Sequence, residues 1–227
     1  MKRVLIACAM MEDEVRCAIE RTRADVDVVW VDRGYHSKPE RLRSELQDRI
    51  DCAEAEGADQ VLLAFGLCGN GAVGLRCRHA VLAMPRFDDC VNLMLQCGER
   101  TRRGLAKAGV MYLTRGWTQD TPATIVGQQR DYVRKYGERR AKRLMEAMFG
   151  AYRRVSVIDT GCFDVNPVMD AARESARVID VEADCVEGSN LVLEKLLAGK
   201  WDDDILTCAP GRAVKQDDFE FAMPARC

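Results

Sequence analysis

The chain has 227 residues, of which 31% are charged and 48% are apolar, and it carries a net charge of -2. This length suits one α/β domain, or two small lobes, with a full hydrophobic core. The near-neutral balance excludes a chain-wide attraction to nucleic acid, and the apolar runs fall short of the roughly 20 residues of a membrane span.

Short apolar runs alternate with helical patterns along the whole chain. The runs that predict strands are Val4–Ala7, Val26–Val31, Val61–Phe65, Ala80–Met84, Val110–Leu113, Val155–Ile158, Val178–Val181 and Ile205–Thr207. The segments that predict helices are Glu12–Thr22, Pro39–Glu56 (with Ser37 as its N-cap), Val91–Ala108, Gly127–Phe149, Val168–Ala176 and Ser189–Leu197. This alternation predicts an α/β fold with a doubly wound, mostly parallel sheet and helices on both faces.

The domain organisation is expected to be simple. No low-complexity linker divides the chain, so residues 1–227 are expected to form a single α/β domain. One irregular stretch, "RGWTQDTPATIVG" (115–127), precedes the longest predicted helix. It either covers the active edge of the sheet or divides the chain into two lobes near residue 120.

The N-terminus resembles a lipoprotein cleavage box, because "MKRVLIAC" has a basic start and ends on a cysteine. A signal peptide needs about 7 to 15 apolar residues before its cleavage site, and only Val4–Ala7 precede Cys8 here. The segment is therefore expected to be a buried strand. Eleven cysteines, an odd number without secretory features, indicate reduced thiols in a cytoplasmic protein.

Cysteines recur where the predicted strands end. In open α/β sheets, ligands bind outside the carboxyl ends of the strands. Six cysteines follow predicted strands, and up to six thiols are expected at the same rim of the sheet: Cys8, Cys68, Cys90, Cys162, Cys185 and Cys208. This thiol-rich rim is the main functional signal of the sequence.

The stretch "AFGLCGNGAVGLRCRH" (64–79) contains a literal G-x-G-x-x-G after a predicted strand. A dinucleotide loop needs a full helix after its glycines and an acidic residue about 20 positions further on. Here the next strand begins near Ala80, which excludes that reading on spacing. The glycines at 66, 69 and 71 instead permit positive φ angles and close approach to a ligand of Cys68, or they form a tight turn.

The stretch "MPRFDDCVNLM" (84–94) places Cys90 at the start of a predicted helix. The helix N-terminus and Arg86 are expected to lower the pKa of this thiol and so to favour a thiolate. In the alternative interpretation, Asp88 or Asp89 caps the helix and Cys90 is buried on its apolar face.

The absence of C-x-x-C pairs and the small number of histidines limit the kind of metal site that these thiols could form. No C-x-x-C pair occurs, so a site would be assembled from dispersed strand ends, and only two histidines are present. Soft thiolate ligands suit zinc, copper(I) or an iron–sulfur cluster.

A basic stretch spans residues 130–154, with nine Lys or Arg and three acidic residues. It is expected to be the solvated face of a helix, and an anionic partner is the alternative.

Several motifs together resemble the domain-of-unknown-function family 1638 of bacteria and archaea. They are "IAC" near the start, "GLCGNGAVGL", "PRFDDC", "YLTRGW" and "IDTG". The resemblance implies a link to corrinoid-dependent methyltransferase systems of one-carbon metabolism, and a signature of three cysteines that fall at Cys8, Cys68 and Cys90. The resemblance implies that many relatives carry histidine where this chain has Asp88. The fourth ligand therefore stays open among Cys162, Asp88, Asp89, Cys208 and an external group.

The leading hypothesis is a cytoplasmic protein with a thiolate-coordinated metal or iron–sulfur site. Its ligands are Cys8, Cys68 and Cys90, with Cys162 as the fourth, and the cofactor is an iron–sulfur cluster or zinc. The amides of Gly69, Asn70 and Gly71 would donate hydrogen bonds around it. An open position would take a small-molecule ligand or a corrinoid protein or methyltransferase partner; neither nucleic acid nor a membrane is expected to be a partner.

Two rival hypotheses remain, and whether the protein is an enzyme stays open. In one, Cys68 or Cys90 is a metal-free nucleophile in a site shaped by Asp89 and Arg86. In the other, a non-catalytic accessory protein docks on a methyltransferase through Arg139, Arg140 and Arg143.

Overall fold

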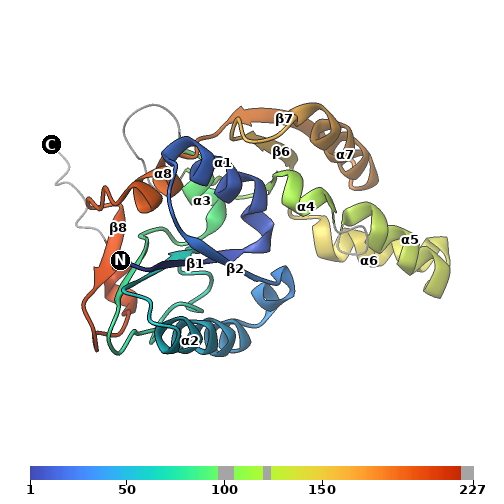
Figure 1. Cartoon of the computed structure of the whole chain (residues 1–227). Helices are drawn as coiled ribbons and strands as arrows, with labels where there is room; N and C mark the ends of the chain where they lie inside the picture. Colours follow the sequence, from blue (N-terminus) through green and yellow to red (C-terminus); the bar gives the residue numbers. More distant parts are fainter. Residues whose placement is uncertain (97–104, 120–123, 221–227) are drawn as a thin grey trace, which may run out of the picture. The chain divides into compact units, whose positions relative to one another are not determined.

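The chain folds into two compact units (Figure 1). The structure, a computed structural model, describes residues 1–96, 105–119 and 124–220, except for the side chains of 36 and 37. Unit 1 comprises residues 1–93 and 190–227, and unit 2 comprises residues 94–189. Unit 2 is therefore inserted into unit 1, and its ends meet where the Ser189 amide donates to the Met94 carbonyl over 2.9 Å.

Unit 1 is built on a five-stranded sheet of order β2-β1-β3-β4-β8. Its strands are β1 (Arg3–Cys8), β2 (Asp27–Val31), β3 (Gln60–Ala64), β4 (Val81–Pro85) and β8 (Ile205–Cys208). The first four are parallel, and β8 is antiparallel to β4, with Leu82 opposite Cys208. Strands β1, β3 and β4 are buried over nearly their whole length, as expected of parallel strands covered on both faces.

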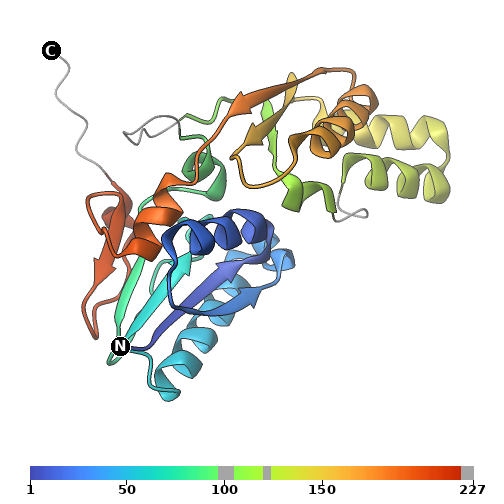
Figure 2. The same cartoon turned by 45° about the horizontal axis from the view of Figure 1, so that its top comes forward.

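Helices cover both faces of this sheet (Figures 1 and 2). Helices α1 (Glu12–Thr22) and α8 (Leu191–Ala198) pack together on one face, and α2 (Pro39–Ala55) lies on the other. The short elements of unit 1 are η1 (Ala9–Met11), η2 (Arg33–Ser37), α3 (Cys90–Met94) and η3 (Gln216–Phe219). The predicted doubly wound α/β fold is thus confirmed.

Unit 2 has its own three-stranded parallel sheet, of order β5-β6-β7. Its elements are β5 (Val110–Leu113), α4 (Arg115–Gln119), α5 (Ile125–Tyr136), α6 (Glu138–Phe149), β6 (Arg154–Asp159), α7 (Val165–Val178) and β7 (Glu182–Glu187). Val155 and Val157 of β6 pack against Val168 and Ala172 of α7 in a core separate from that of unit 1.

The division into units differs from the lobe boundary expected near residue 120, and from a single domain. Residues 115–119 form α4, which contacts both β5 and α7. These elements lie on either side of residue 120 in the chain, so the expected boundary falls inside unit 2. Residues 120–123 lie outside the described part.

The long helix predicted over Gly127–Phe149 is wrong, because two helices occupy this stretch. They meet at Gly137, whose φ of 75° and ψ of 162° belong to a region of backbone space that is essentially restricted to glycine. Gly137 therefore ends α5 and precedes α6, and α6 runs back along α5 (Figure 1). The 3.6-residue pattern continues through both helices, which is why the sequence conceals the break.

Three other expectations about elements are corrected. Val178–Val181 is the end of α7 and a turn, because Asp180 has a φ of 56° and the strand that pairs with β6 begins at Glu182. The helix expected over Val91–Ala108 ends at Met94, and residues 97–104 lie outside the described part. Lys38 rather than Ser37 precedes α2, since Ser37 belongs to η2.

Candidate functional site

Cys8 ends β1, at the centre of the parallel part of the sheet. Cys8 is 1% exposed and pairs with Val31 of β2. Burial raises the pKa of the Cys8 thiol to about 12, and a hydrogen bond from the backbone of Met10 counteracts part of this effect. The thiol is therefore protonated at neutral pH.

Cys68 lies in an unusual loop after β3. Cys68, Gly69 and Asn70 have φ angles of 49°, 63° and 70°, so three consecutive residues are left-handed. Glycine adopts this conformation without steric cost and asparagine does so readily, so Cys68 is the strained residue of the three. Of the three glycines expected to have positive φ, only Gly69 does. Gly66 packs closely against backbone atoms, and Gly71 packs closely against the Leu42 side chain.

Two hydrogen bonds tie this loop to the loop after β4. The amides of Leu67 and Cys68 donate to the carbonyls of Phe87 and Asp88 over 2.8 and 2.9 Å. A Cβ atom on Gly66 would come within 2.8 Å of the Asp89 backbone, so only glycine allows the two loops to approach this closely. The pairing brings Cys68 toward Cys90.

Cys90 begins α3 and is 5% exposed. The expected lowering of its pKa is wrong: burial raises the pKa of the Cys90 thiol well above its ordinary value, and Cys68 and Asp89 raise it further. Arg86 points elsewhere, donating to the carbonyls of Asp218 and Asp203. The alternative holds, since Asp89 caps α3 by accepting from the Asn92 amide over 2.8 Å.

The three cysteines form one cluster, here called the thiol cluster. Cys90 acts electrostatically on Cys8, Cys8 acts on Cys68, and Cys68 acts on Cys90, and in each case burial is the larger cause of the raised pKa. The ionisable groups that also act on the cluster are Glu14, Asp32, Arg33 and Asp89. Of these groups, which all belong to the described part of the chain, three are acidic and one is a cation.

The chemistry of the thiol cluster fits a soft cation. Sulfur is its donor atom throughout, and a bound cation would favour the thiolate forms that burial, and to a smaller extent the acidic neighbours, disfavour. Among residues 1–96, 105–119 and 124–220, however, no three His, Cys, Asp or Glu side chains stand close enough to hold a metal ion as they are. Binding would therefore require the thiol side chains to turn toward one another.

The backbone amides that act on the thiols differ in part from the expected ones, which were those of Gly69, Asn70 and Gly71. The amide of Gly71 donates to the Cys68 carbonyl over 3.1 Å, in a tight turn. A backbone hydrogen bond from Gly66 lowers the pKa of Cys68, although burial and Cys8 outweigh it. Gly66 and Met10, the residues whose amides act on the sulfurs, were not singled out for that role from the sequence, which carries no signal for the direction of a backbone amide. The roles of Gly69 and Asn70 stay predictions.

The expectation that six thiols share one rim is wrong. Cys208 ends β8, and because β8 runs antiparallel to β4, Cys208 lies opposite Leu82 near the start of β4. Its sulfur accepts a hydrogen bond from Arg212 over 2.7 Å. Cys185 lies within β7 of the other sheet, opposite Val157.

Cys162 belongs to unit 2, in the loop after β6. Its thiol donates a hydrogen bond to the Thr160 carbonyl over 3.4 Å. Its part as a metal ligand stays a prediction. Cys97 lies outside the described residues.

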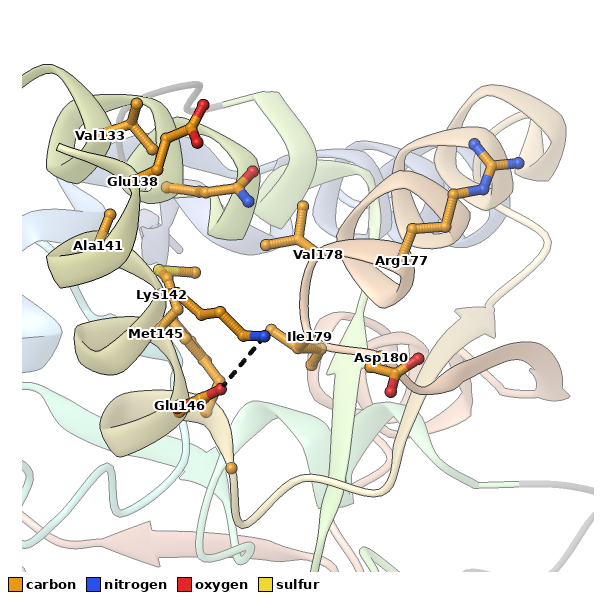
Figure 3. A pocket seen from close by; sticks show the side chains of 13 residues that line it. Val133, Glu138, Ala141, Lys142, Met145, Glu146, Arg177, Val178, Ile179 and Asp180 are labelled. Carbon is orange, nitrogen blue, oxygen red and sulfur yellow. Dashed lines mark ion pairs between the residues drawn. The ribbon is translucent and has the colours of Figure 1, made fainter.

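A separate cavity of about 620 Å³ lies in unit 2, between α6 and the end of α7 (Figure 3). Met145 and Ile179 provide apolar lining, and Lys142 extends its ammonium group across the cavity, 4.0 Å from Glu146. The rim carries charges of both signs, so it shows no preference for a cationic or an anionic ligand. None of the thiol cluster contributes to it.

Comparison with known proteins gives one match. A family model described as "Protein of unknown function (DUF1638)" matches residues 30–197. No curated protein and no solved structure matches the chain. None of the described helices is long and apolar enough to cross a membrane.

Proposed function

We propose that this chain, which belongs to the DUF1638 family, binds a soft metal centre, zinc or an iron–sulfur cluster, through Cys8, Cys68 and Cys90. The observation that carries the proposal is the thiol cluster: the thiols of buried Cys8 and Cys90 and of half-buried Cys68 act on one another at the carboxyl ends of adjacent parallel strands. That is where open α/β sheets bind their ligands.

The raised pKa values predict how the centre would form. Cys8 and Cys68 hold their protons to about pH 12 in the metal-free protein, so a metal ion must displace them at neutral pH. Metal affinity then rises with pH, because each proton released on binding contributes a factor of about ten per pH unit. The Met10 and Gly66 backbones, which already hydrogen-bond to these sulfurs, would stabilise the thiolates formed.

The fourth position of the centre has local candidates. Asp89 acts on both Cys68 and Cys90, and one of its carboxylate oxygens is already engaged by Asn92. An external small molecule is the alternative, and Cys162 and Asp88 stay in the proposal. Bound zinc would hold a thiol-bearing ligand as thiolate, whereas an iron–sulfur cluster would accept and release electrons.

The cellular setting is part of the proposal. Free thiols at the exposed residues Cys52 and Cys185 are typical of a reducing compartment, which supports a cytoplasmic location. The link to corrinoid proteins and methyltransferases rests on the family resemblance alone and stays a prediction. The rival nucleophile at Cys68 or Cys90 is disfavoured, because the thiolate is the reactive form and burial raises the pKa of both thiols.

The test is to purify the protein without oxygen and to measure metal content, acid-labile sulfide and the visible spectrum. The wild type is compared with C8A/C68A/C90A and with C17A/C52A/C185A, which removes three cysteines outside the thiol cluster. We expect near-stoichiometric metal in the wild type and the control, and none in the cluster variant. A visible band that bleaches with dithionite would indicate iron–sulfur.

Two results would overturn the proposal. One is a wild type that takes up neither zinc nor a reconstituted cluster. The other is metal content that the cluster variant retains. Circular dichroism of all three proteins checks that they share the same fold, so that loss of metal in the cluster variant is not a result of unfolding.

A further inference from the structure

Helices α5 and α6 form an antiparallel hairpin, here called the basic hairpin (Ile125–Phe149), within unit 2. It contains seven Lys or Arg and three Asp or Glu, in a chain whose net charge is -2. The hairpin is therefore a positive region on a protein that is otherwise negative. Such a local concentration of charge attracts partners of the opposite sign.

Internal ion pairs use only part of this charge. Arg134 pairs with Asp131, Lys142 with Glu146, and Arg130 with Glu174. Among the residues that the structure describes, Lys135, Arg139 and Arg143 form no ion pair, and all three are exposed. Arg140 lies over the Tyr136 ring at 5.3 Å instead. These cations are available to an acidic surface.

The hairpin also exposes apolar side chains, which a purely solvated helix face does not need. In the described part of the chain, five large hydrophobic side chains are exposed, and three belong to the hairpin: Val133, Tyr136 and Met148. Tyr132 connects two of them, because its ring lies 6.2 Å from that of Tyr136 and its hydroxyl donates to the Met148 sulfur over 3.3 Å.

Arginine, tyrosine and methionine are the residues that protein–protein interfaces concentrate. On this hairpin Arg140 lies against Tyr136, and Met148 lies against Tyr132. Arg139, Arg140 and Arg143 are not among the residues that line the unit 2 cavity. The basic face is thus distinct from the mixed-charge cavity of Figure 3.

We propose that the basic hairpin docks on an acidic surface of a partner protein, with Tyr136 and Arg140 at the centre of the contact and Arg139 and Arg143 beside them. This proposal does not depend on the metal centre. A membrane fits less well, because the apolar stripe of α6 (Ala141, Met145 and Phe149) is buried inside unit 2 and leaves no face to insert. Nucleic acid fits less well because the patch is short and the sequence pI is about 5.8.

The test measures binding of the full chain to three probes at about 50 mM and about 300 mM salt, a range over which surface charges become strongly screened. The probes are an acidic Glu- and Leu-containing helical peptide, a single-stranded RNA and vesicles containing phosphatidylserine. We expect the peptide to bind most tightly and its affinity to fall at least about tenfold in R139E/R140E/R143E.

The matched control, R41E/R76E/K200E, reverses three exposed charges of unit 1 that form no described ion pair and should bind the peptide as the wild type does. Y136A tests the apolar centre and should weaken binding even at the higher salt. The proposal is overturned by tighter binding of RNA or vesicles, by equal losses in both triple variants, by an unchanged affinity of Y136A, or by no binding of the peptide.

Discussion

At the scale of single residues, burial decides the state of the thiol cluster. A cysteine at the start of a helix, close to an arginine in sequence, is expected to ionise easily. Cys90 does not, because α3 is only five residues long and the cost of burying a thiolate exceeds the effect of its backbone amide. The cluster is thus held ready for a cation that displaces protons, rather than poised to attack an electrophile.

The raised pKa of Cys8 predicts how stability depends on pH in the metal-free protein. The folded state holds this proton to about pH 12, while the unfolded chain releases it near the ordinary value of 9.0. Stability is therefore fully present below pH 9 and falls as the pH rises toward 12, by up to about 1.4 kcal/mol per pH unit. Urea unfolding from about pH 8 to about pH 11 should show a shallower fall for Cys8→Ala than for the wild type.

The exposed Cys52 provides the control for this measurement. Cys52→Ala should follow the wild-type curve over the same pH range. Parallel curves for the wild type and Cys8→Ala would contradict the burial of the Cys8 thiol.

At the scale of elements, the site depends on two loops that fit against each other. The loop after β3 carries Cys68 and the loop after β4 leads to Cys90, and two backbone hydrogen bonds join them. Gly66 makes this possible because it leaves no Cβ against the Asp89 backbone. The glycines of this region thus serve the contact between loops and the left-handed turn at Gly69, not a dinucleotide.

Gly66→Ala should separate these loops. The new Cβ would meet backbone atoms of Phe87 and Asp89 at 2.8 to 2.9 Å, so we expect a loss of about 1–3 kcal/mol in the free energy of unfolding. Metal binding should weaken as well. Gly57→Ala is the comparison, because its Cβ meets nothing within 4 Å and only its φ of 83° carries a cost, about 1 kcal/mol.

Urea titrations of both variants, with metal content measured in parallel, decide this point. If Gly66→Ala keeps wild-type stability and metal content, the loop contact does not support the site.

At the scale of the whole molecule, the thiol cluster and the basic hairpin belong to different units. Unit 1 supplies Cys8, Cys68 and Cys90, and unit 2 supplies α5, α6 and Cys162. The inserted unit has its own sheet and core, and the residues at its two ends are hydrogen-bonded to each other. Metal binding and docking are therefore expected to be separable.

A variant in which a short Gly/Ser linker replaces residues 94–189 tests this separation. It should fold, as judged by circular dichroism and cooperative urea unfolding, and bind metal at the wild-type stoichiometry. C162A in the full chain controls for the loss of this cysteine. If the deletion variant folds but neither protein holds metal, Cys162 is a ligand and the two units share the site.

The sequence by itself determined the α/β class and nearly all the strands, because period-2 and period-3.6 patterns are local signals. Strand-end positions nominated six cysteines, and the family resemblance pointed to Cys8, Cys68 and Cys90 among them. It did not reveal the Gly137 break, since a hairpin of two amphipathic helices keeps the period of one. The sequence also did not reveal the direction of β8. Only its antiparallel pairing with β4 shows that Cys208 lies far from the end of β1 that carries Cys8.

Tertiary structure alone decided which thiols cluster and how they titrate. Cys8, Cys68 and Cys90 are distant in sequence, and they meet because parallel pairing aligns the ends of β1, β3 and β4. Their pKa values follow from burial, which is a property of the packed interior and not of the flanking residues. Spacing can therefore nominate ligands, but only packing sets their charge.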